Sequence, residues 1–167
     1  KRTCPFAGAC ANYCYAQKGA YIWSNVSPAF QHRYLATKCD SFVDKMIAEI
    51  KKKNVDMLRV HDSGDYYSKK YINKWVAIAK ALPDVKFYSY TKSIPLFLDQ
   101  DMPSNFDIIY SEGGTRDDLI DYSKDRHCKI FNDMESLNSA GYVCAMDSDV
   151  MATKWFNRSN KVGLIMH

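Results

Sequence analysis

Apolar residues recur at spacings of three and four between residues 30 and 50, which is the period of one face of an α-helix. Ser27-Pro28 before this stretch is typical of a helix start, and the lysines at 51–53 suit the negative end of the helix dipole. We therefore predict one long helix from residue 27 to about residue 54. A second apolar face, closed by Pro83, predicts a helix that begins near Ser68.

Short apolar runs alternate with these helices. They predict strands at 57–61, 85–90, 106–110, 129–131, 142–145 and 162–166, with shorter helices at 94–98 and 115–122. The runs lack a polar alternate face, as is typical of strands that helices cover. Alternating strands and helices with short connections predict βαβ units and a mainly parallel sheet. The fold class is therefore α/β.

The chain has 167 residues without a repeat or a low-complexity linker, so we predict one domain over residues 1–167. Residues 1–26 show no clear periodicity and are interpreted as a cysteine-rich loop that wraps around a metal or cluster. Residues 27–167 form the β/α core.

Polar and reactive residues follow nearly every predicted strand. They are His61, Asp62, Ser63, Asp65, Thr91, Lys92, Ser93, Ser111, Glu112, Asn132, Asp133, Asp147, Asp149 and His167. Asp and Ser are also common as turn and cap residues, but Lys92 and His61 are not explained in that way. Parallel β/α folds carry their ligand sites at this rim, so we expect a small or partial (β/α) barrel with a small-molecule ligand there.

Composition excludes several classes of protein. Hydrophobic residues make up 47% and charged residues 25%, close to globular averages, which excludes a disordered or fibrous chain. The net charge of +4 is too small to predict nucleic-acid binding by itself. No apolar run approaches the roughly 20 residues needed to cross a bilayer, so no membrane association is expected.

The six cysteines fall into two groups. Cys4, Cys10 and Cys14 lie within eleven residues, whereas Cys39, Cys128 and Cys144 are scattered in apolar contexts and are expected to be buried in the core. A core of this size does not need disulfides, and no signal-peptide pattern is visible. We interpret the chain as a reduced, cytoplasmic protein whose clustered thiols hold a metal, with disulfide pairing inside the cluster as the alternative.

The cysteine spacing indicates which metal centre to expect. Three thiolates from one loop leave one coordination position open, and in a [4Fe–4S] cluster three cysteines leave the fourth iron free for a ligand. The absence of a Cys-x2-Cys pair disfavours a structural zinc finger. A zinc site that adds His32, His61 or an aspartate to the three cysteines remains the alternative.

Several segments in order along the chain resemble the phage gene product 88 family. They are Thr3-Cys-Pro-Phe-Ala-Gly-Ala-Cys10-Ala-Asn-Tyr-Cys14-Tyr-Ala16, Arg59-Val-His-Asp-Ser-Gly-Asp65, Phe87-Tyr-Ser-Tyr-Thr-Lys-Ser93, Ser111-Glu-Gly-Gly114 and Gly163-Leu-Ile-Met-His167. The resemblance spans nearly the whole chain. It implies a bacteriophage protein that acts in the cytoplasm of the infected bacterium.

More distantly, the layout is similar to radical S-adenosylmethionine enzymes, although those enzymes usually space their cysteines as Cys-x3-Cys-x2-Cys. This resemblance implies a radical-SAM-like partial barrel in which Cys4, Cys10 and Cys14 ligate a [4Fe–4S] cluster that binds S-adenosylmethionine. It also implies that Ser63, Gly64, Asp65, Thr91, Ser93 and Ser111 bind the cofactor. Lys92, Glu112 and His61 are then the expected catalytic residues.

Two other functions stay open at this point, and the sequence does not decide whether the chain is an enzyme. One is a non-enzymatic phage protein with a structural zinc or iron–sulfur site that binds nucleic acid or a host protein, for which the lysines at 51–53 and the 12 tyrosines speak weakly. The other is a metal-dependent hydrolase that uses His61, Asp62, Asp65 and Asp147.

Overall fold

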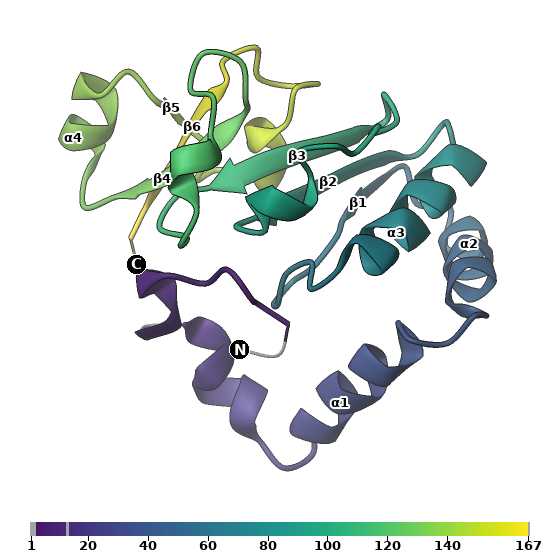
Figure 1. The fold of residues 1–167 in the computed structure, drawn as a ribbon. Coiled ribbons are helices and arrows are strands. Elements are labelled where there is room, and N and C mark those ends of the chain that lie inside the picture. Colours follow the sequence, from purple (N-terminus) through teal and green to yellow (C-terminus); the bar gives the residue numbers. More distant parts are fainter. Residues whose placement is uncertain (1–2, 13, 167) are drawn as a thin grey trace.

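A computed structural model describes residues 3–12 and 14–166 of the chain. Its centre is a curled sheet of six strands in the order β1-β2-β3-β4-β6-β5, and every neighbouring pair is parallel (Figure 1). The strands are β1 (Met57–Arg59), β2 (Lys86–Thr91), β3 (Phe106–Ser111), β4 (His127–Phe131), β5 (Val143–Cys144) and β6 (Lys161–Ile165). The sheet forms about half of a barrel, so the predicted α/β class and parallel partial barrel are confirmed.

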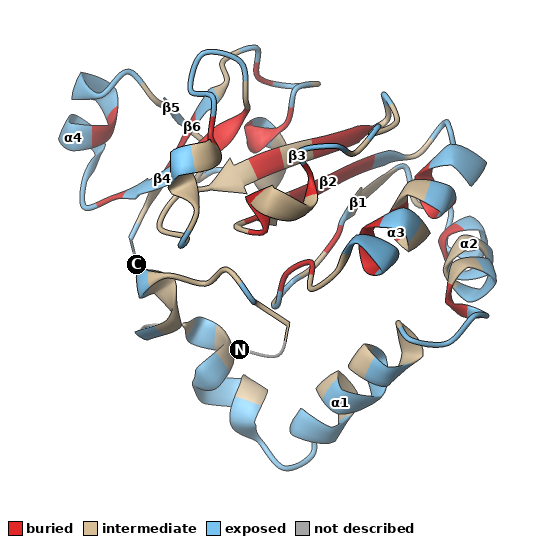
Figure 2. Cartoon of the chain, viewed as in Figure 1, coloured by how far each residue is buried: buried red, intermediate tan, exposed pale blue. Residues whose placement is uncertain are grey.

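Two helices cover one face of the sheet next to β1, β2 and β3. They are α2 (Phe42–Lys52) and α3 (Lys69–Ala81). Ser68 caps the start of α3, because its hydroxyl accepts a hydrogen bond from the Tyr71 amide (3.3 Å). Buried side chains of α3 pack against Phe87 and Phe106 of the sheet. Figure 2 shows this buried material in the central strands and along one side of α3.

A smaller core lies on the opposite face of the sheet. Tyr88, Ile109 and Cys128 pack there against the segment that carries Ala145 and Ala152. This segment links β5 to β6 and contains the 3-10 turn Asp149–Ala152, and the short helix α4 (Met134–Ser139) precedes β5. The curled sheet is therefore filled on both faces.

The predicted long helix is two helices, α1 (Ser27–Ala36) and α2, with a bend between them. The ammonium of Lys74 from α3 donates hydrogen bonds to the carbonyl oxygens of Thr37 (2.9 Å) and Cys39 (2.7 Å). A helix that ran on through this segment would use those carbonyls itself, so the contact with α3 ends α1. None of the α1 residues is buried (Figure 2).

The helix predicted at 115–122 was also wrong, because only the 3-10 turn Asp117–Leu119 forms there. The Asp117 carboxylate accepts hydrogen bonds from the amides of Gly113 (2.7 Å) and Gly114 (2.9 Å) and so closes a turn. Side chains that bond to nearby amides in this way compete with helix formation.

None of the helices in the described part of the chain is both long and apolar enough to cross a membrane.

Candidate functional site

The cysteine loop lies across the carboxyl ends of the parallel strands. Three backbone contacts hold it there: the Asp65 amide donates to the Thr3 carbonyl (2.8 Å), Ala7 forms an antiparallel bridge with Gly114, and the Thr115 amide donates to the Phe6 carbonyl (3.0 Å). The loop thus spans the rim from the end of β1 to the end of β3 (Figure 1). This rim is where parallel α/β folds place their ligand sites.

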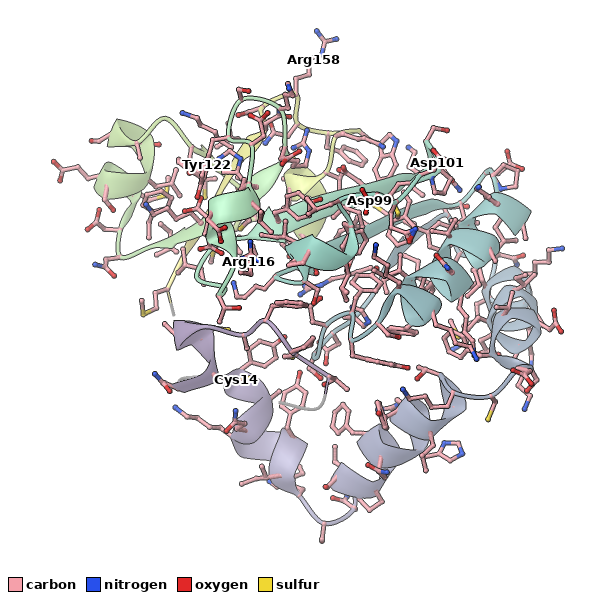
Figure 3. All side chains as sticks on the ribbon, in the orientation of Figure 1. Cys14, Asp99, Asp101, Arg116, Tyr122 and Arg158 are labelled. Carbon is pink, nitrogen blue, oxygen red and sulfur yellow. The ribbon has the colours of Figure 1, made fainter. Side chains whose placement is uncertain are left out.

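All three clustered cysteines line one cavity of about 1290 Å³. Cys4, Cys10 and Cys14 are free and half-buried, and Ser63 and Gly64 line the same cavity. Figure 3 shows Cys14 on the N-terminal segment below the sheet. The structure brings the predicted metal ligands and part of the predicted cofactor segment to one cavity, although they lie about fifty residues apart in the chain.

Within the described residues, no three Cys, His, Asp or Glu side chains are gathered closely enough to hold a single metal ion. The four hydrolase candidates therefore do not form a metal centre there, and no Cys3His group is assembled. A four-iron cluster needs its thiol ligands spread around a much larger body. Three free cysteines of one loop carry the type of donor that such a cluster binds, and they line one cavity.

The surroundings of the Cys4 thiol favour its protonated form. Burial raises its pKa, and the nearby charge of Asp65 raises it further. A thiol must lose its proton to ligate a metal, and the charge of the metal offsets this cost. Binding of a metal by the Cys4 thiol would therefore release a proton.

Asp65 ties the end of β1 to the end of β2. One carboxylate oxygen accepts from the Thr91 hydroxyl (2.6 Å) and the Tyr66 amide (2.7 Å), and the other accepts from the Lys92 amide (2.8 Å). Burial raises the pKa of the Asp65 carboxyl, which these hydrogen bonds oppose. Ser93 joins the network, because its amide donates to the Thr91 hydroxyl (2.9 Å) and its own hydroxyl to the Tyr66 carbonyl (2.6 Å).

Lys92 ties the end of β2 to the end of β3. Its ammonium donates to the Ser111 carbonyl (2.9 Å), to the Ser111 hydroxyl (2.7 Å) and to the Glu112 carbonyl. An ammonium has three protons, so all of them are engaged. The Glu112 carboxylate accepts from the Tyr142 hydroxyl (2.9 Å). The predicted catalytic residues Lys92 and Glu112 thus lie together, and Lys92 stabilises the rim on which the loop rests.

Gly64 permits the loop to approach the end of β1. Its φ of +84° is in the left-handed region, and a Cβ atom there would lie 3.1 Å from the Thr3 hydroxyl oxygen. Any other residue at this position would be strained and would push Thr3 away. Ser63 and Gly64 therefore form the part of the rim that faces both the loop and the cavity.

His61 is the most unusual residue of the rim. It has a left-handed backbone with φ of +70°, and its ring lies between Tyr66 and Tyr71. Its Nε2 atom is 3.1 Å from the Tyr71 hydroxyl, and its buried Nδ1 atom has no partner among the described residues. Burial, with a smaller effect of Arg59, lowers the pKa of His61 to about 4. The imidazole is therefore neutral at neutral pH.

Two tyrosines that were not among the predicted site residues also hold the loop. The Tyr21 hydroxyl donates to the Asp62 carboxylate (2.7 Å), and the Tyr15 hydroxyl donates to the Asp62 carbonyl. Their only signal in the sequence was position, because both follow the cysteine cluster closely. Asp62 therefore serves as a polar anchor for the loop.

The remaining cysteines differ from the prediction in part. Cys128 is buried in the smaller core, as predicted, and Cys144 is half-buried. Cys39 is exposed, so its predicted core position was wrong. The bend between α1 and α2 is the reason, since it removes Cys39 from the continuous apolar face on which that prediction depended. His167, the last predicted rim residue, lies outside the described residues.

Comparison with known proteins links residues 1–165 to one family model, described as Gene product 88. The Gene 88 protein of Mycobacterium phage L5 is 26% identical over 142 residues, which cover 77% of this chain and 59% of that protein. The Gene 88 protein of Mycobacterium phage D29 is 28% identical over 123 residues, which cover 65% and 51%. The matched region thus spans only half to three-fifths of these relatives. No solved structure matches the chain.

Proposed function

The chain belongs to the gene product 88 family, and we propose that its cysteine loop holds a [4Fe–4S] cluster through Cys4, Cys10 and Cys14. One iron would stay open to a small ligand such as S-adenosylmethionine. The supporting observation is that three free thiols from one loop line the same cavity as the rim segment at Ser63 and Gly64. A reduced cluster of this kind suits the cytoplasm of the infected host, where thiols stay reduced.

The residues of the chain would then have distinct tasks. A bound cluster supplies an electron and one open coordination position. The loop cysteines would hold it, while Asp65 and Lys92 would keep the three strand ends at fixed distances beneath it. His61, neutral at neutral pH, would present an uncharged imidazole at the cavity wall, where it can act as a hydrogen-bonding group. These tasks describe a radical-SAM-like enzyme, and the relationship itself is part of the proposal.

Anaerobic purification tests the cluster. We expect a brown protein with about four irons and about four sulfides per chain, and an iron spectrum typical of a [4Fe–4S] centre. Cys10→Ala should lose the colour and the iron. Cys144→Ser is the matched control, because Cys144 lies on β5 away from the cavity, and it should keep both.

Two results would overturn the proposal. One is a colourless protein with one zinc per chain, which would instead support a structural metal site in a protein that binds nucleic acid or a host protein. The other is full iron content in Cys10→Ala. If the spectrum of the cluster-loaded protein does not change on addition of S-adenosylmethionine, the cluster proposal stands and S-adenosylmethionine is rejected as its ligand.

A further inference from the structure

The cavity extends far beyond the thiols. Its volume of about 1290 Å³ exceeds the roughly 300–1,000 Å³ that is usual for small-molecule sites. The cysteines form one wall of the cavity, and helices form another. Arg33 of α1 and Lys45 of α2 belong to this helical wall. The helical wall, defined here by these two cations and the aromatic residues around them, has no task in cluster binding.

Arg33 is positioned but unpaired. Its guanidinium lies 5.4 Å from the centre of the Phe30 ring, and it makes no ion pair with any described carboxylate. The ring attracts a guanidinium at this distance without using its N–H donors, which stay available to another group. Lys45 likewise has no ion pair within the part of the chain that the structure describes. Both cations are exposed toward the cavity.

The acidic groups that line the cavity are engaged elsewhere. Glu49 pairs with Lys53 (3.1 Å), Asp62 accepts from Tyr21, and Asp65 is buried among three donors. Neither cation therefore has an ion-pair partner among the described carboxylates of its own cavity. An anionic ligand would supply the missing charge.

Most of the other side chains on the helical wall are apolar or aromatic, and Ser27, Thr37 and Ser41 contribute hydroxyl groups. The apolar and aromatic side chains include Phe30, Tyr34, Phe42, Met46 and Trp75. Flat rings and a methionine accommodate a flat, apolar body. The wall thus combines a surface for a planar group with a docking point for an anion.

We propose that the helical wall binds an organic anion with a planar aromatic body, and that its phosphate or carboxylate docks on Arg33 with Lys45 nearby. We infer that this anion is the substrate, and this step rests on the proposed cluster. The end of the anion opposite its charged group would face the cysteine wall. Binding of the anion itself does not depend on the cluster.

Calorimetric titration at low salt tests the proposal, with the four 5′-nucleoside monophosphates as planar phosphate probes. The matching nucleosides lack the anion, ribose 5-phosphate lacks the planar body, and benzoate is a smaller planar anion that carries a carboxylate. We expect at least one complete planar anion to bind more tightly than its neutral or non-aromatic counterpart. Whether the phosphate probes or the carboxylate probe bind identifies the anionic group that the site recognises.

Variants locate the site. Arg33→Gln should lower the affinity for the anion by about tenfold or more, as expected for the loss of a charge-assisted hydrogen bond. Lys45→Gln should lower this affinity less. Lys52→Gln is the control, because Lys52 lies on α2 outside the cavity, and it should change little. Equal affinity of anions and neutral counterparts, an unchanged Kd in Arg33→Gln, or no binding of any probe would overturn the proposal.

The titrations are repeated with Cys10→Ala protein, which separates the two proposals. If the original protein holds no iron, but both it and Cys10→Ala bind the anion through Arg33, the anion site is retained and the cluster is rejected. Iron binding without any anion binding would do the reverse.

Discussion

Gly8 of the cysteine loop lies against the backbone of Gly113 at the end of β3. A Cβ atom at Gly8 would be 2.4 Å from the Gly113 carbonyl oxygen and 3.0 Å from the carbonyl carbon of Gly114. These are backbone atoms that cannot rotate away. The two segments, a hundred residues apart in the chain, therefore fit only because residue 8 has no side chain.

Gly8→Ala should separate the loop from the rim. The clash should lower the free energy of unfolding by about 1–3 kcal/mol and reduce iron retention, because Cys4 and Cys10 lie on either side of Gly8. Urea unfolding and iron analysis measure the two effects. Gly141→Ala is the control: its φ of +71° costs about 1 kcal/mol of strain, but a Cβ atom there meets nothing within 4 Å. Equal iron loss in both variants would contradict the assignment.

Asp65→Asn should loosen the junction of β1 and β2. The amide nitrogen of an asparagine would face one of the three donors that now point at the carboxylate, which leaves a buried group unsatisfied. We expect a loss of about 1–3 kcal/mol in urea unfolding. Asp133→Asn, an exposed helix cap at which asparagine serves equally well, should change stability little. A neutral effect of Asp65→Asn would show that the carboxylate does not stabilise the rim.

His61 should make stability depend on pH. Its pKa is about 4 in the folded protein and 6.5 as the usual value, so between these values the unfolded chain binds more protons. Stability from this group is therefore complete above pH 6.5 and is lost as the pH falls towards 4, by up to about 3 kcal/mol. His61→Asn should flatten the profile in that window, since asparagine tolerates the left-handed backbone.

The measurement is urea unfolding at a series of pH values for both proteins. The exposed His32→Asn variant should keep the slope of the original protein. A profile that is as steep in His61→Asn as in the original protein would assign the pH dependence to other groups.

Arg126 should contribute strongly to the stability of the part of the fold around the smaller core. Its Nε atom lies 3.5 Å from the Asp107 carboxylate, both side chains are less than a tenth exposed, and its guanidinium donates to the carbonyls of Ala152, Asn157 and Ser159. Arg126→Met leaves Asp107 buried without its cation, which typically costs about 3–5 kcal/mol. Thermal and urea unfolding measure this loss.

Arg116→Met provides the comparison for Arg126, because Arg116 forms an exposed ion pair with Asp118 (3.0 Å). Solvent screens exposed pairs of this kind, so they contribute little to stability. Similar small losses in the two variants would show that the buried pair does not hold the segment at 152–159 in place.

The strands and the helix at residues 69–81 follow from local pattern, and the sequence alone determined them. Apolar runs between turn residues predicted the six strands, and Ser68 with the periodic face up to Pro83 predicted α3. Both signals act within a few residues, so no knowledge of the folded chain was needed. The choice of a parallel sheet followed from the alternation of the two element types.

Tertiary structure decided where α1 ends and how the rim residues are used. Lys74 caps the carbonyls of Thr37 and Cys39 from another helix, which no pattern within residues 27–54 reveals. The sequence likewise identified Asp65 and Lys92 as polar residues at strand ends, but only the sheet order makes them each other's neighbours and engages their charges. The cavity shared by the cysteines and Ser63 has the same origin, since contacts between distant segments depend on the packed fold and leave no periodic trace in the chain.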